Sequence, residues 1–128
     1  MFNSVALVAL GAAAGAVLRW IFGLGLNGLF PAMPLGTLAA NLLGGYLMGI
    51  MMALLATPLA HAPELRLLMV TGFLGGLTTF SAFSGEVARL IEQGRLAMAG
   101  AEIATHVIGS VTLTLLGVAT VVALRRTG

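Results

Sequence analysis

The chain has 128 residues, of which 59% are hydrophobic and 8% are charged. Because a soluble domain carries roughly a quarter of its residues as charged side chains, this composition excludes a surface that faces water on all sides. The six positive residues are all arginine, and with four glutamates they leave a net charge of +2, too little for a nucleic-acid-binding surface. The absence of cysteine excludes disulfides, thiolate zinc sites and cysteine nucleophiles.

Long stretches without a charged residue mark the candidate membrane spans. They cover residues 1–18, 20–63, 67–85 and 103–124, and a membrane helix needs about 20 mostly apolar residues. The longest stretch is divided by the turn-forming residues Asn27, Gly28, Pro31 and Pro34. Since backbone groups in lipid must bond within the protein, the spans are predicted to be helices.

The sequence therefore predicts an all-α membrane protein with a single four-helix transmembrane domain over residues 1–128. The helices are expected at residues 4–23, 35–56, 66–91 and 97–124. The connections at residues 24–34, 57–65 and 92–96 are too short to hold a soluble domain.

The arginines do not favour either orientation in the membrane. Four spans place both termini on one side, and each side carries three arginines. The side of the termini has Arg66, Arg125 and Arg126, and the other side has Arg19, Arg89 and Arg95. This balance favours a chain that inserts both ways and pairs antiparallel with itself; the alternative is a weak bias that these boundaries miss. Four helices leave little room for a path inside one subunit, so a polar route between subunits is expected.

Two pairs of glycines are spaced for close helix packing. Gly11 and Gly15 lie four apart in the first span, and Gly45 and Gly49 do so in the second. Such spacing lets helix backbones touch, either within one subunit or between subunits.

Polar residues inside the spans must find partners there. Thr37 and Asn41 share one face of the second span, and the NH2 group of Asn41 can donate to an anion or serve an interhelical hydrogen bond. His106, Ser110 and Thr114 form one polar stripe on the fourth span. The alternative for these hydroxyls is a bond back to their own helix. With two histidines and no cysteine or aspartate, a transition-metal site is not favoured.

The third span is a poor continuous helix. Gly75 and Gly76 weaken it, and Thr78 and Thr79 compete for its carbonyls, so a break is expected near residues 75–79. Broken membrane helices are tolerated where the freed backbone lines a site, and exposed carbonyls coordinate hard cations.

Beyond the expected break, Phe80 and Phe83 lie on one face, where their electropositive ring edges could face an anion; packing in the core is the alternative. Glu86 and Arg89, and likewise Glu92 and Arg95, are three apart and are expected to be solvated or paired at the helix end.

Three blocks of sequence, at residues 15–20, 36–44 and 72–86, resemble the Fluc fluoride-channel family, also called CrcB. The third block, with Gly75-Gly76, Thr78-Thr79, Phe80 and Phe83, is the specific one. The resemblance implies a dual-topology antiparallel homodimer in the bacterial inner membrane. Its two narrow pores would export fluoride passively.

The resemblance also assigns residue roles. Asn41 would donate to the ion beside the aromatic pair Phe80 and Phe83, and Ser110 would line the pore. Ser81 and Thr114 would belong to a hydroxyl track. Carbonyls of Gly75 and Thr78 would hold a structural sodium ion at the dimer axis.

Arg19, Glu86 and His106 are candidates for a vestibule or structural role. Ala82 stands where the family often has threonine, which removes one hydroxyl from the track.

Fluoride selectivity can also be argued from physical chemistry. Fluoride holds water tightly, so a path must replace that water with donors such as the Asn41 amide and the hydroxyls of Ser81, Ser110 and Thr114. Conduction needs several weak sites, and the spans place no charge at mid-depth.

Two other classes remain open. A small dual-topology cationic drug/proton antiporter would need a buried carboxylate, and a structural membrane subunit would need neither Asn41 nor a broken helix. An enzyme is not expected, because no Ser–His–Asp set or metal-ligand cluster is evident.

Overall fold

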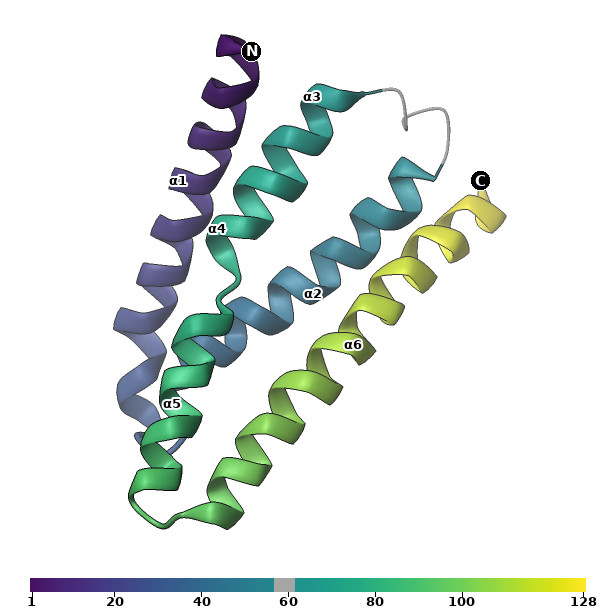
Figure 1. Ribbon diagram of the computed structural model, residues 1–128. Coiled ribbons are helices and arrows are strands. Elements are labelled where there is room, and N and C mark those ends of the chain that lie inside the picture. The colour runs from purple at the N-terminus through teal and green to yellow at the C-terminus, as the bar shows by residue number, and fades with distance from the viewer. Residues whose placement is uncertain (57–61) are drawn as a thin grey trace.

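The computed structural model describes residues 1–56 and 62–128, and these residues form four long apolar helical segments (Figure 1). The first is α1 (Phe2–Leu26) with the short η1 (Asn27–Leu29), the second is α2 (Leu35–Leu55), and the last is α6 (Leu96–Thr127). The third runs through α3 (Pro63–Leu65), η3 (Arg66–Leu74), α4 (Gly75–Leu77) and α5 (Phe80–Glu92). All four are long and apolar enough to cross a membrane, which confirms the predicted all-α membrane protein.

The observed boundaries differ from the predicted ones chiefly after the first span. The connection expected from residue 24 begins later, because α1 continues to Leu26 and η1 follows it. Asn27 then caps the next helix: its Oδ1 accepts from the backbone N–H groups of Gly36 (2.8 Å) and Thr37 (3.3 Å). The predicted connection over residues 57–65 lies partly outside the described residues, which omit 57–61.

The segments pack in two pairs. Helix α2 makes its most extensive contact with α6, and α1 does so with η3. Figure 1 shows α2 and α6 running side by side, with both termini toward the same end of the molecule. Many large apolar side chains on α1 and α6 point outward, such as Leu10 and Ile108, each 66% exposed, as suits helices surrounded by lipid.

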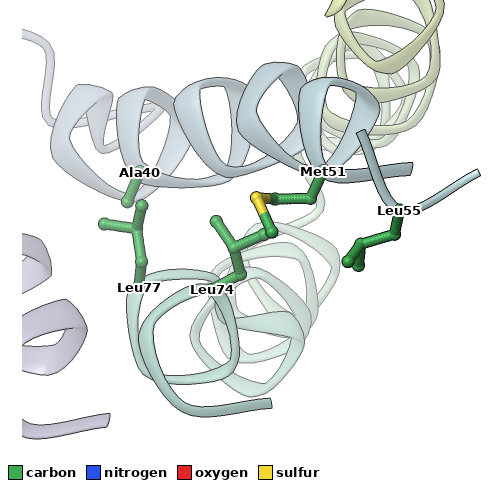
Figure 2. Packing of buried hydrophobic residues seen from close by; sticks show 5 residues of the cluster. All are labelled: Ala40, Met51, Leu55, Leu74 and Leu77. Atoms are coloured by element: carbon green, nitrogen blue, oxygen red, sulfur yellow. The ribbon is translucent and has the colours of Figure 1, made fainter. Parts of the chain in front are cut away.

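The buried apolar core lies between α2 and the first half of the third segment. Ala40, Met51 and Leu55 of α2 face Leu74 of η3 and Leu77 of α4 (Figure 2). A second cluster joins α5 to α6 and consists of Phe83, Val87, Leu90 and Ala99. The two halves of the third segment therefore pack against different neighbours, with the break between them.

Both pairs of glycines pack helices within the subunit. A Cβ atom on Gly15 would clash with the Phe73 carbonyl oxygen, and one on Gly11 with the Leu68 carbonyl oxygen, so this pair seats α1 on η3. A Cβ atom on Gly49 would clash with the Thr114 carbonyl oxygen, and one on Gly45 would lie 2.9 Å from the Ser110 carbonyl oxygen. Of the two roles predicted for these motifs, the structure shows the one inside the subunit.

We expect Gly49→Ala to lower the free energy of unfolding by about 1–3 kcal/mol, because the added methyl group overpacks α2 against the α6 backbone. Gly100→Ala is the matched control, since nothing lies within 4 Å of the added Cβ on this exposed residue of α6. Denaturant unfolding in detergent measures both. Equal stability of the two variants would contradict the close contact of α2 with α6.

Candidate functional site

The third segment breaks at Thr78 and Thr79, as the sequence predicts. Both residues are extended, with φ/ψ of −81°/152° and −148°/113°, whereas Gly75 and Gly76 remain helical. The side chain of Thr79 begins the next helix, because its Oγ1 accepts from the Ala82 backbone N–H at 3.1 Å. The two threonines, more than the glycines, therefore form the interruption.

Asn41 on α2 holds the broken backbone. Its Oδ1 accepts from the Thr79 backbone N–H at 2.7 Å, and its Nδ2 donates to the Thr79 carbonyl oxygen at 3.1 Å. Nδ2 also lies 3.2 Å from Nδ1 of His106 on α6. The predicted interhelical role of Asn41 is therefore present, and it joins three membrane segments at one amide.

The break releases backbone carbonyls from helical hydrogen bonding. In a continuous helix the carbonyls of Gly75 and Thr78 would accept from the N–H groups of Thr79 and Ala82. Those N–H groups instead donate to side chains of Asn41 and Thr79. A third carbonyl, that of Gly76, accepts from Arg19 Nε at 3.0 Å, so Arg19 supports the break from α1.

A groove of about 440 Å³ lies beside the break. We call it the central groove. It gathers most of the site residues that the sequence predicts: Asn41, Gly75, Thr78, Phe80, Phe83, His106, Ser110 and Thr114. Arg19, Ser81 and Glu86 do not line it.

The two phenylalanines differ in their surroundings. Their ring centroids are 5.6 Å apart in an edge-to-face arrangement. Phe83 is buried and stacks on the His106 ring at 4.6 Å, whereas the Phe80 side chain is 78% exposed in the single subunit. The core-packing alternative therefore describes Phe83 but not Phe80.

The hydroxyl groups are also used in different ways. Thr114 Oγ1 is 2.9 Å from both the Gly45 and the Ser110 carbonyl oxygens, so its proton serves helix packing, as the alternative for this stripe anticipates. Ser110 lines the groove. Ser81 is exposed and lies 3.3 Å from the Thr79 hydroxyl.

A second cavity of about 550 Å³, the side cavity, lies next to the groove. Arg19, Ala82 and Glu86 line it, and Thr79 borders both cavities. Arg19 and Glu86, two of the three candidates for a vestibule or structural role, therefore line the same cavity, whereas His106 lines the central groove. Ala82 lines the side cavity as well.

The expectation that Glu86 is solvated or paired with a neighbouring arginine is wrong. Glu86 is 9% exposed, and its Oε1 accepts from the Thr37 hydroxyl at 2.7 Å. The reason is that α5 is strongly amphipathic, and Glu86 lies on its buried face together with Phe83, Val87 and Leu90.

Glu102 is the functional candidate that sequence reasoning missed. It is fully buried, and neither of its carboxylate oxygens has a hydrogen-bond partner among the described residues. One ligand atom each from Glu86, Glu102 and His106 lies within 4.8 Å of the others. The expectation of no such cluster is therefore wrong. The available signal was the four-residue spacing of Glu102 and His106, which places them on one helix face.

These features define a multi-pass membrane protein whose third helical segment is broken beside a largely apolar groove. A family model described as "CrcB-like protein, Camphor Resistance (CrcB)" matches residues 6–118, and the chain belongs to that family. The predicted resemblance is thereby confirmed.

Similar proteins come from several bacteria. A protein of Tolumonas auensis is 60% identical over 126 residues, covering 98% of this chain and 99% of its own length. One of Chromobacterium violaceum is 56% identical, with 98% and 100% covered, and one of Pseudomonas paraeruginosa is 57% identical, with 91% and 92% covered. Each is named "Fluoride-specific ion channel FluC". With the four apolar segments, these relatives establish a bacterial multi-pass membrane protein.

We expect Thr79→Val to lower the free energy of unfolding by about 1 kcal/mol, because α5 loses its N-terminal cap. Thr105→Val is the control, since this exposed hydroxyl bonds only to the preceding turn of α6. Thermal unfolding of the purified proteins compares them. A larger loss in Thr105→Val than in Thr79→Val would contradict the capping role.

Proposed function

We propose that this protein is a fluoride-selective passive channel, not an enzyme, that exports fluoride through two pores in an antiparallel homodimer. The observation that carries the proposal is the central groove, where the Asn41 amide and the edge-to-face pair of Phe80 and Phe83 meet on an apolar wall. Amide N–H groups and ring edges attract a small anion without the tight binding of a full charge. The names of the relatives support the choice of ion.

The open side of the groove supports the proposed dimer. Phe80 is presented outward on the single subunit, and a second copy would complete the wall around it. The balance of three arginines on each side is compatible with two opposite insertions. In this arrangement Ser81 joins the path from its exposed position, and Ser110 and Thr114 form the wall on α6.

The released carbonyls support a structural sodium ion at the dimer axis. Gly75 and Thr78 have carbonyls without their helical donors, and two copies together would supply four oxygens. Such carbonyls suit a hard cation. The ion would hold the two breaks together, while Arg19 and Glu86 border the vestibule through which fluoride enters.

Fluoride efflux from liposomes tests the channel. We expect rapid fluoride efflux and no chloride efflux. The fluoride rate should fall roughly two- to tenfold in Phe80→Ile and in Phe83→Ile, because each removes an aromatic edge worth about 0.5–1.5 kcal/mol. Phe2→Ile is the control, since this ring is 86% exposed at the start of α1, outside the groove. Unchanged fluoride rates in both groove variants would remove the aromatic role.

The same liposomes address the antiporter alternative, which the buried carboxylates of Glu86 and Glu102 favour. An antiporter would move an organic cation against a proton gradient and would leave fluoride inside. That result would replace the channel proposal.

Orientation-locked variants test the dimer. We expect Thr127→Lys with Gly128→Lys to fix one orientation, and Gln93→Lys with Leu96→Lys to fix the other, because each pair breaks the arginine balance. Each locked form alone should be inactive in fluoride efflux, and co-expression should restore activity. Full activity of one locked form by itself would contradict the antiparallel dimer.

A further inference from the structure

Four buried polar atoms without partners converge where α5 meets α6. They are Glu86 Oε2, both carboxylate oxygens of Glu102, and His106 Nε2, none of which has a hydrogen-bond partner among the described residues. Glu102 is fully buried, and His106 and Glu86 are 4% and 9% exposed. We call these three residues the carboxylate cluster. Unpartnered buried polar atoms are costly, so their convergence indicates a bound ligand.

The hydrogen bonds of Asn41 fix which nitrogen of His106 carries a proton. The orientation of the amide is set by Thr79, whose N–H donates to Oδ1 and whose carbonyl accepts from Nδ2. The second proton of Nδ2 then points to His106 Nδ1, 3.2 Å away, so Nδ1 accepts. Neutral His106 therefore has its proton on Nε2, which is buried and has no hydrogen-bond partner among the described residues.

This tautomer decides between a metal ion and a proton as the ligand. A metal ion bound at Nε2 would require Nε2 to lose its proton. Because Nδ1 already accepts from Asn41, the ring would then carry no proton at all. A proton bound between the carboxylates leaves the Nε2–H group intact and available as a donor beside them. Two carboxylates this close and this buried cannot both stay charged without a cation between them, and a shared proton supplies it.

The other charged groups around the cluster do not reach its oxygens. Arg19 of α1 lines the side cavity with Glu86, but its Nε donates to the Gly76 carbonyl. Arg89 and Arg95 border a third cavity with Glu86 and are exposed to solvent. From α2 the facing groups are Thr37 and Asn41, neither of which titrates.

We propose that Glu86 and Glu102 bind one proton between them, beside His106, whose Nε2–H is available as a donor. The cluster is thus a proton-binding site immediately behind the central groove. Glu102 is its defining member, because it supplies the second carboxylate and has no other partner among the described residues.

The site is linked to the groove through Asn41, a consequence that rests on the proposed function. At acid pH the cluster takes up a second proton, which binds to Nδ1 of His106. The protonated Nδ1 can no longer accept a hydrogen bond from Nδ2 of Asn41. The amide N–H is then released toward the groove, and the new Nδ1–H adds a second donor. Fluoride binding and uptake of this second proton should therefore favour each other.

Infrared spectroscopy of the purified wild-type protein at neutral pH tests the proton site without reference to ion transport. We expect a C=O band of a protonated carboxyl group, lost in Glu102→Gln and retained in the control Glu92→Gln, whose side chain is exposed. A wild-type spectrum without the band would overturn the proposal. So would one divalent metal ion per chain retained after dialysis, or a band that Glu102→Gln leaves unchanged.

Nitrogen NMR of labelled His106, in a His61→Gln background that removes the second histidine, tests the tautomer and the link. We expect a protonated Nε2 and a bare Nδ1 at neutral pH, and at mildly acid pH a shift to the doubly protonated ring with sodium fluoride but not with sodium chloride. A protonated Nδ1 at neutral pH would overturn the proposal.

The two proposals fail in different ways. A carboxyl band without fluoride efflux from liposomes would defeat the channel and leave the proton site. Fluoride efflux without the carboxyl band would defeat the proton site and leave the channel.

Discussion

The side-chain amide of Asn41 makes the hydrogen bonds that the broken third segment cannot make for itself. In lipid an unsatisfied backbone group costs several kcal/mol, so a break in a membrane helix persists only where another group replaces the lost bonds. Asn41 binds both the N–H and the carbonyl of Thr79, and Thr79 in turn caps α5. The contact of Asn41 with Thr79 thus takes the donor that the Gly75 carbonyl would have in a continuous helix, and it fixes the backbone from which α5 and Phe80 begin.

The same amide limits how an anion can bind. Both N–H groups of Asn41 are already engaged, one with Thr79 and one with His106. In the proposed channel, an anion in the central groove would therefore have to displace an existing partner of Asn41. The lost bond offsets part of the binding energy of the anion, which favours repeated entry and release.

Much of the fold follows from residue patterns that act locally. Uncharged runs of about 20 residues locate the spans, and Thr78 and Thr79 mark the break because their side chains compete with the helix for backbone groups. The burial of Glu86 and Glu102 was not predictable in this way, since spacing to Arg89 suggested a solvated pair and Glu102 stands at the edge of an uncharged run. Their burial arises when the one-sided α5 packs on α6, a tertiary contact that local spacing does not encode.

Among the described residues, no aspartate, glutamate, lysine or arginine lines the central groove itself. The groove offers an amide, two ring edges and hydroxyl-bearing residues, while the buried acids lie behind it, with His106 between them and Asn41. A carboxylate facing the groove would repel an anion, and an arginine there would hold one too firmly. Phe83, which also lines the groove, stacks on the His106 ring. The proposed proton site therefore acts on the groove through the His106 imidazole. A bare Nδ1 accepts a hydrogen bond from Asn41, and a protonated Nδ1 releases the Asn41 N–H group.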